Sequence, residues 1–174
     1  DPYLSRGLGD VYKRQELVHK MTEYHKLINE INNGKLSPIY LIHGDESFYS
    51  DKLVQHIIDS VITNDSVDFD LKKIYAKKSN EFQEAEVVDF LKRYPLVGEY
   101  NLMIVKDSKN LSNDFSLIQS YIENINQKSI LVLSFNNTVD KRKKIYKSIF
   151  KSGIIFESKK IYENQVYQLS LIHI

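Results

Sequence analysis

Short apolar runs alternate with amphipathic helical patterns along most of this chain, and this alternation constrains the fold more than any other feature. Residues 39–42, 102–105, 130–133 and 154–156 are continuous apolar runs, which is typical of strands buried on both faces of a sheet, and residues 71–76 predict one further strand. Parallel strands need crossover connections, and helices supply them. The alternation therefore predicts an α/β fold in three layers, with a parallel sheet covered by helices on both faces.

The segments between the strands have apolar residues at helical spacing, as in Tyr24, Leu27, Ile28 and Ile31. Pro95 and Gly153 follow two of these segments, and Gly153 is the expected C-cap. No linker interrupts the pattern, so one domain is expected. The expected helices run from Tyr24 to Ile31, from near Phe48 to Val61, from Phe82 to Arg93, from Asp114 to Asn124 and from Asp140 to Lys151.

The two ends of the chain are related to each other in an unusual way. Leu169–Ile174 can be encoded by a DNA string whose reverse complement encodes Asp10–Gln15, and the pair resembles a translated sequencing adapter. We therefore expect residues 1–15 and 169–174 to be adapter-derived, and we leave them out of the fold argument. The natural domain is expected within residues 16–168, with Met21 as its candidate true start and its natural C-terminus missing.

Composition excludes several functional classes. The chain has no Cys, which rules out disulfides, thiolate zinc sites and Cys nucleophiles and fits a reducing, cytoplasmic location. It has no apolar run of about 18 residues, so no membrane partner is expected. The chain has 24 Lys and Arg against 23 Asp and Glu, so any contact with nucleic acid would have to be local. His19, His25, His43 and His56 show no metal-ligand spacing, and His43 is expected to be structural.

Gly44 lies between the first strand and a helix, where a P-loop enzyme holds its nucleotide. A P-loop needs G-x-x-x-x-G-K-[ST], because the glycines let backbone N–H groups approach the phosphates and the Lys binds their negative charge. The positions of the second Gly, the Lys and the Ser or Thr are occupied here by Tyr49, Ser50 and Asp51. We therefore predict a degenerate nucleotide loop without nucleotide chemistry, formed by Gly44, Asp45, Glu46, Ser50 and Asp51. Asp45 and Glu46 would repel a triphosphate; they either contact a neighbouring subunit or, as their residue type favours, cap the helix.

Two other positions lie where an ATPase would place catalytic groups. Asp107, at the end of a strand, is followed by Ser108 rather than by a second acid, and a strand-end turn is predicted. Asn136 and Asn137 follow the next strand, where turn chemistry is again the better explanation.

A cluster of basic residues follows Asp140, on a helix whose expected apolar residues are Ile145, Ile149 and Phe150. The basic residues either contact DNA phosphates or form a solvated helix face, as most charge runs do. They are Lys141, Arg142, Lys143, Lys144, Lys147 and Lys151.

Five segments occur in a fixed order along the chain: Pro38–Glu46, Arg93–Glu99, Val105–Asp107, Asp140–Lys144 and Phe156–Val166. Together they resemble the N-terminal domain of the delta subunit of the bacterial DNA polymerase III clamp loader, in its Bacteroidetes form, over residues 21–166. The resemblance implies an AAA+/RecA-like P-loop fold that does not hydrolyse ATP. It implies a non-catalytic subunit of a DNA-directed DNA polymerase complex, which as a whole is a nucleotidyltransferase, and no cofactor. In the full subunit a helical lid and a helical collar follow this domain.

The resemblance also implies partners and a contact site. The delta subunit binds the sliding clamp and stabilises its open form for loading on primed DNA, together with other clamp-loader subunits; primer-template DNA is met through the complex. An adjacent pair of hydrophobic residues before the third strand enters a pocket on the clamp, and Leu96 and Val97 match it. Val97 is smaller than the aromatic residue of the best-known version, which makes Leu96 the better anchor. From the residues alone, the alternative is a core-facing helix end.

Three functions remain open at this point. The first is a replication subunit that binds a clamp, and the second is a divergent nucleotide-binding α/β ATPase with magnesium-dependent binding near Gly44. The third is a structural scaffold with neither affinity.

Overall fold

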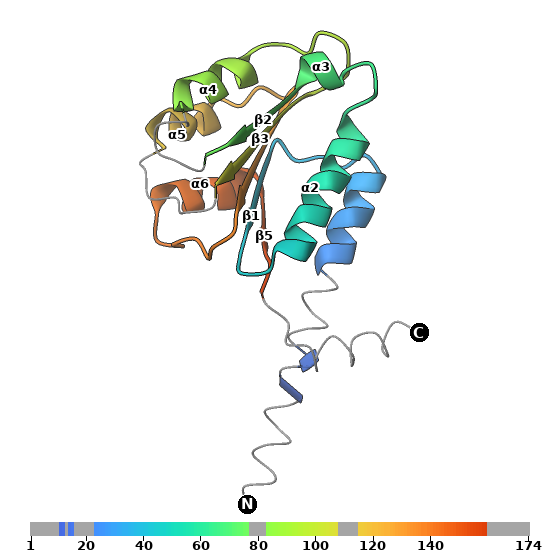
Figure 1. The fold of residues 1–174 in the computed structure, drawn as a ribbon. Coiled ribbons are helices and arrows are strands. Elements are labelled where there is room, and N and C mark those ends of the chain that lie inside the picture. The colour runs from blue at the N-terminus through green and yellow to red at the C-terminus, as the bar shows by residue number, and fades with distance from the viewer. Residues whose placement is uncertain (1–10, 13, 16–22, 77–82, 108–114, 160–174) are drawn as a thin grey trace, which may run out of the picture.

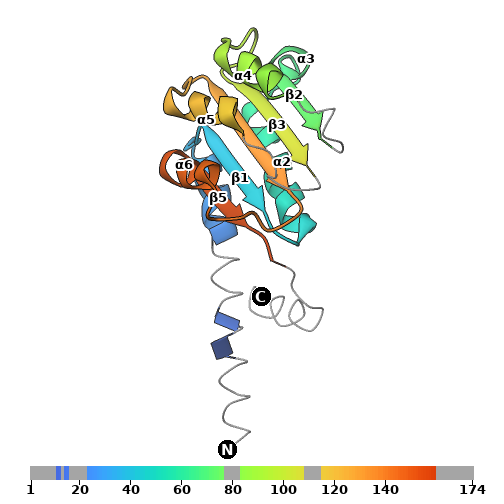
Figure 2. The same cartoon turned by 90° about the vertical axis from the view of Figure 1, so that its left-hand side faces the viewer.

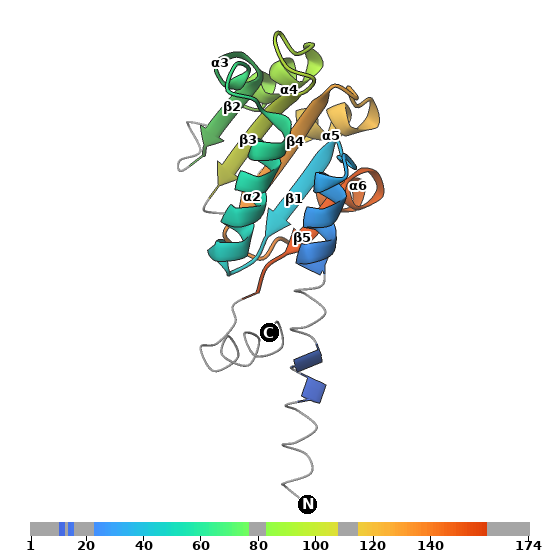
Figure 3. The same ribbon diagram turned by 90° about the vertical axis from the view of Figure 1, so that its right-hand side faces the viewer.

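A fully parallel five-stranded sheet organises the computed structural model, which describes residues 11–12, 14–15, 23–76, 83–107 and 115–159. Its strands lie in the order β2-β3-β4-β1-β5 (Figures 1 and 3). β1 pairs with β4 on one side and with β5 on the other. All five predicted strands are confirmed: β1 (Ile39–His43), β2 (Leu71–Tyr75), β3 (Asn101–Asp107), β4 (Ser129–Phe135) and β5 (Ile154–Glu157).

Helices cover both faces of this sheet, as the alternating pattern predicted. α4, α5 and α6 lie over one face (Figure 2), whereas α2 and the helix formed by residues 23–32 lie over the other (Figure 3). Within the described residues, no helix combines the length and apolar character needed to cross a membrane. The numbered helices are α2 (Ser47–Val61), α3 (Val67–Asp70), α4 (Glu84–Lys92), α5 (Ser116–Glu123) and α6 (Lys144–Ser152).

The central strands supply a hydrophobic core on each face, because successive side chains of a strand point to opposite sides. In β1, Ile39 and Leu41 pack with α4, α5 and α6, while Tyr40 and Ile42 pack with α2 and the helix at 23–32. β3 and β4 divide their apolar residues in the same way. This explains why these strands are continuous apolar runs in the sequence.

The basic helix begins later than the sequence analysis predicted. α6 starts at Lys144, not at Asp140, because Asp140 forms a turn: its Oδ1 accepts the backbone N–H of Arg142 at 2.9 Å, and its carbonyl accepts the N–H of Lys143 at 3.3 Å. Residues 141–143 therefore precede the helix. Of the three apolar residues noted on this helix, Ile145 and Ile149 are buried, whereas Phe150 is 72 % exposed.

Gly153 ends α6 as predicted, but for a different physical reason. Its N–H donates to the carbonyl of Ile149 at 2.7 Å, and its φ of −143° does not require glycine. A Cβ at this position would lie 2.5 Å from the carbonyl oxygen of Ile39. Glycine is needed here because the chain passes close to β1 as it turns into β5.

Several predicted features lie outside the described residues. They include Met21 and His19, the start of the helix at Phe82, Asp114, and Ser108 after the third strand. The segments 1–10 and 160–174, which hold most of the expected adapter sequence, also lie outside them.

Candidate functional site

Leu96 and Val97 are exposed in the loop of residues 93–100, which joins α4 to β3. Their exposed fractions are 68 % and 50 %, and Tyr94 in the same loop is also exposed. The alternative of a core-facing helix end is therefore wrong, and the pair lies beyond the end of α4 rather than on its last turn. α3, which carries the exposed Val67 and Phe69, lies near this loop (Figure 1). We call this region, formed by Val67, Phe69, Tyr94, Leu96 and Val97, the apolar surface.

A buried carboxylate holds the loop that carries this surface. Asp70 ends α3 and is fully buried, and it accepts three consecutive backbone N–H groups. Its Oδ1 accepts the N–H of Leu96 at 2.7 Å, and its Oδ2 accepts those of Val97 at 3.0 Å and Gly98 at 2.5 Å. Asp70 could not be identified from the sequence, because its partners are 26 to 28 residues away and no local pattern marks them.

The surroundings of Asp70 favour its charged form. Burial by itself raises the pKa of this carboxyl, but the backbone N–H groups of Gly98, Leu96 and Val97, together with the charge of Arg93, outweigh burial and lower the pKa. The hydrogen bonds are therefore charge-assisted, which makes them stronger than bonds between neutral groups.

The base of the loop is fixed by two amide side chains. The Nδ2 groups of Asn101 and Asn126 both donate to the carbonyl oxygen of Arg93, at 2.6 and 3.2 Å, and Asn126 also donates to the carbonyl of Leu91. These bonds satisfy carbonyls that the end of α4 leaves without helical partners. Arg93 itself donates through Nη2 to the carbonyl of Phe69 at 2.8 Å, which ties the loop to α3 a second time. The loop thus leaves α4 in a defined direction.

At the predicted nucleotide loop, another segment of the chain packs against the backbone. Gly44 has φ +125°, and a Cβ on it would lie 1.8 Å from the carbonyl oxygen of Ser158. The N–H of Gly44 donates to the carbonyl of Asn137 at 3.2 Å, and that of Glu46 faces the carbonyl of Ser158 at 3.4 Å. Amides that a P-loop would direct at phosphate have acceptors within the protein here.

The side chains of this loop serve the start of α2. Glu46 is the N-cap, and its Oε1 accepts the N–H of Phe48 at 2.9 Å, which confirms the capping interpretation for Glu46. Ser50 is buried, and its hydroxyl donates to the carbonyl of Glu46 at 3.1 Å. Asp51 is exposed and pairs with Lys106 at 3.4 Å, and Asp45 is exposed.

His43 ends β1 next to this loop and is fully buried. Its Nδ1 accepts the N–H of Val139 at 3.2 Å, whereas its Nε2 has no partner among the described residues. Burial lowers the pKa of this imidazole; the charge of Glu157 opposes that shift and the charge of Lys141 adds to it. The structural role predicted for His43 thus holds for one ring nitrogen.

The remaining candidates do not form a site. Asp107 is the last residue of β3, and the turn predicted to follow it lies outside the described residues. Asn136 and Asn137 lie in a bend after β4, as turn chemistry predicted. His56 lies 2.8 Å from the side-chain oxygen of Asn32. The part of the chain that the structure describes holds no group of three or more His, Asp or Glu side chains placed to bind a metal.

Only some residues of the basic cluster form ion pairs with acidic side chains. Lys141 pairs with Glu157 at 3.1 Å, and Arg142 pairs with Asp140 at 3.1 Å, both at exposed positions. Lys144, Lys147 and Lys151 are exposed, and no ion pair links them to a described residue.

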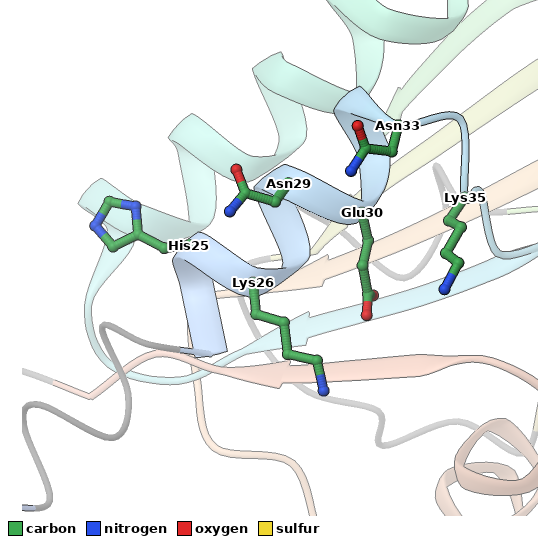
Figure 4. Close-up of a pocket in the computed structure, with 6 residues that line it drawn as sticks. All are labelled: His25, Lys26, Asn29, Glu30, Asn33 and Lys35. Atoms are coloured by element: carbon green, nitrogen blue, oxygen red, sulfur yellow. The ribbon is translucent and has the colours of Figure 1, made fainter.

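An open hollow lies beside the helix at 23–32 (Figure 4). Figure 4 shows its lining side chains on that helix and on the turn after it, with both charge signs present. Of the predicted candidates it contains only His25, so it does not bring the predicted residues together. The lining residues are His25, Lys26, Asn29, Glu30, Asn33 and Lys35.

Comparisons with known proteins place this architecture in a family. The family model described as DNA polymerase III, delta subunit, matches residues 40–159. DNA polymerase III subunit delta of Bacillus subtilis is 24 % identical over 141 residues, which cover 75 % of this chain and 40 % of that protein. A Ureaplasma parvum protein named probable ATP-dependent 6-phosphofructokinase is 25 % identical over 128 residues, which cover 63 % of this chain and 40 % of that protein.

The solved structure of the Bacillus subtilis DNA clamp loader delta protein has a similar fold. It superposes with a TM-score of 0.75 at 21 % identity, covering 86 % of this chain and 46 % of that one. This confirms the expected α/β architecture with a parallel sheet. The chain spans less than half the length of these relatives. Because the family model matches more than half of the chain, from β1 to the end of β5, the chain belongs to the DNA polymerase III delta subunit family.

Proposed function

We propose that this chain contributes the clamp-binding domain of a clamp-loader delta subunit in DNA replication. In this proposal it binds the sliding clamp through Leu96 and Val97, stabilises the open clamp, works with other clamp-loader subunits and does not hydrolyse ATP. The observation that carries the proposal is the exposure of this apolar pair on a loop held by a buried carboxylate. Membership of the delta family supplies the partner class.

The energetics of the apolar surface fit protein binding. Full burial of an aliphatic side chain is worth about 1.5–3 kcal/mol, and Leu96 keeps 68 % of its surface available for a partner. A loop already fixed by hydrogen bonds loses little conformational freedom on binding, so more of this energy appears as affinity. A few such anchors supply most of the energy of an interface.

Opening of the clamp requires more than affinity. A ligand shifts an equilibrium only by the difference between its affinities for the two states. We therefore expect the chain to bind a clamp variant that stays monomeric more tightly than the closed ring. Equal affinity for the two forms would contradict the opening role and would leave a simple docking role.

The backbone around Gly44 supports a function without nucleotide. The N–H groups of Gly44 and Phe48 have acceptors within the protein, and the carbonyl of Ser158 lies against Gly44. We expect no increase in melting temperature with millimolar magnesium-ATP. An increase that depends on magnesium would instead favour the divergent ATPase, and chemical-shift changes near Gly44 would locate the site.

Contact with primer-template DNA through the complex is a second part of the proposal. Of the predicted residues, Lys143 and Lys144 are the better candidates, because Lys141 and Arg142 already pair with acidic neighbours. Lys144→Ala should remove one phosphate contact. In a plot of log affinity for DNA against log salt concentration, the slope measured for the assembled loader should therefore become shallower by about one unit. Lys141→Ala serves as the matched control.

Binding of this chain to a bacterial sliding clamp tests the main proposal. Leu96→Asp should weaken binding by roughly 10- to 100-fold, which corresponds to the loss of one buried aliphatic anchor. Leu117→Asp is the matched control, because Leu117 is also an exposed leucine but lies on α5. Equal affinities of the two variants for the clamp would refute the assignment of the site.

A further inference from the structure

We propose that Asp70 is the positioning residue of the clamp-binding loop: its buried carboxylate holds the backbone of residues 96–98 in the shape that presents Leu96 and Val97 to a partner. This inference rests on the function proposed above and adds a residue that the apolar pair itself does not reveal. Asp70 is fully buried, so it cannot touch a partner and can act only through the loop.

The geometry is that of an anion bound by a run of backbone amides. Three consecutive N–H groups, those of Leu96, Val97 and Gly98, point at one carboxylate over 2.5–3.0 Å. Successive N–H groups that converge in this way form a concave site for negative charge. Here the protein supplies the anion itself, from a helix that lies outside the loop in the sequence.

Asp70 is the main constraint on the outer part of the loop. For residues 94–98, every hydrogen bond seen within the described region goes to Asp70. The other ties, from Asn101, Asn126 and Arg93, act at the base of the loop. Without the carboxylate, the exposed segment would be fixed only where it leaves α4.

The consequence for binding follows from population. A loop that samples several shapes binds with an affinity reduced by the fraction of molecules in the competent shape. By holding one shape, Asp70 would raise this fraction before the partner arrives. Its effect should therefore appear in clamp affinity and also in the free protein.

The experiment compares Asp70→Asn with the unchanged chain by clamp affinity and by amide hydrogen exchange. Asn keeps the shape of Asp but replaces an anionic acceptor by a neutral amide. We expect clamp binding to weaken at least about tenfold, the scale of replacing charge-assisted hydrogen bonds by neutral ones. Exchange at the amides of Leu96, Val97 and Gly98 should accelerate by a similar factor, while β1 and β4 keep their protection.

Ser50→Ala is the matched control. Ser50 is buried at the start of α2, and its hydroxyl donates to the carbonyl of Glu46 rather than to residues of the loop. Its loss should lower stability and leave both clamp affinity and the exchange of the three loop amides unchanged. If Ser50→Ala weakens clamp binding as much as Asp70→Asn does, general destabilisation explains the effect and the inference is wrong.

A second variant covers the case in which Asp70→Asn does not fold. A Cβ in Gly98→Ala would lie 3.2 Å from Oδ2 of Asp70 and from Cβ of Ser66, close enough to displace the shortest of the three bonds. It should reproduce the faster exchange and the weaker binding to a smaller extent. Unchanged exchange and affinity in both variants, or in Gly98→Ala alone if the other does not fold, would overturn the inference.

Leu96→Asp separates the two proposals. If it loses clamp binding while Asp70→Asn keeps both binding and protection, the clamp site stands and the positioning role fails. If Leu96→Asp binds as the unchanged chain does, the clamp site fails, and exchange at the three amides then decides whether Asp70 orders the loop.

Discussion

Replacing Gly44 by alanine should destabilise this protein strongly, and the effect can be estimated from two features of the structure. At φ +125°, an L-residue is strained by about 1–3 kcal/mol. The new Cβ would also lie 1.8 Å from the carbonyl oxygen of Ser158, so the segment after β5 must move, and forcing atoms into a packed site costs about 1–3 kcal/mol. Together these effects predict a loss of about 2–6 kcal/mol in the free energy of unfolding.

Chemical and thermal denaturation of the two glycine variants Gly44→Ala and Gly34→Ala would measure this loss. Gly34 has φ +81°, and a Cβ added to it would meet no atom within 4 Å, so its substitution carries backbone strain alone, about 1–2 kcal/mol. At about 2–4 °C per kcal/mol, a loss of about 2–6 kcal/mol in Gly44→Ala should lower the melting temperature by roughly 4–24 °C. Equal losses in the two variants would refute the packing argument and would reopen Gly44 as the opening of a ligand loop.

Substitutions at Gly153, His43 and Asp70 should also have measurable effects on stability. Gly153→Ala should cost about 1–3 kcal/mol in denaturant titrations, because its Cβ would lie 2.5 Å from the carbonyl oxygen of Ile39; a cost no larger than that of Gly34→Ala would contradict this. The pKa of His43 is lowered by burial, so the unfolded chain binds the proton first and stability should fall as the pH drops below about 6.5. His43→Asn keeps an acceptor for the N–H of Val139. In urea titrations of this variant, the free energy of unfolding should depend less on pH below pH 7, and an unchanged pH dependence would contradict the assignment. The pKa of Asp70 is lowered in the fold, so its contribution is complete above about pH 3.9 and is lost as the pH falls through the folded pKa. Asp70→Asn should therefore show a smaller loss of stability on acidification below about pH 4, and an acid limb as steep as that of the unchanged chain would argue against an ionised Asp70.

The loop after β1, predicted to be a degenerate nucleotide loop, combines features that the sequence shows with others that only the structure shows. The absence of the P-loop Lys is visible in the sequence at Ser50. Only the structure shows that Ser50 is buried and bonded to Glu46, and that the chain after β5 lies against Gly44. Gly44 permits this close packing, and the N–H groups of Gly44, Glu46 and Phe48 donate to acceptors within the protein.

The central strands β1, β3 and β4 could be predicted because their apolar runs reflect burial on both faces of the sheet. The register places Ile39 beside Leu131 and Leu41 beside Leu133, so each apolar pair belongs to one layer of the core. The start of α6 could not be predicted in the same way. Residues 141–143 have a composition that suits a helix, but the hydrogen bonds of Asp140 form a turn before it.

The candidate site, too, could be predicted only in part from the sequence. The resemblance singled out Leu96 and Val97, but sequence alone left open whether they face the core or solvent, because an apolar pair beside a helix end fits either. Exposure depends on what packs against the pair, and that is decided by the position of α3 and β3. Phe150 is also exposed, and its position beside Ile149 in the sequence did not reveal this.

The sequence by itself determined the order of strands and helices and the absence of a working P-loop, because periodicity and residue identity are local properties. The tertiary structure decided which residues meet across long separations. Asp70 and the amides of residues 96–98 are 26 to 28 residues apart, and no local pattern pairs a carboxylate with backbone N–H groups at that distance. Only the pairing of β2 with β3 brings the end of α3 to the loop before β3. There the buried charge of Asp70 is stabilised because three backbone N–H groups donate hydrogen bonds to its carboxylate.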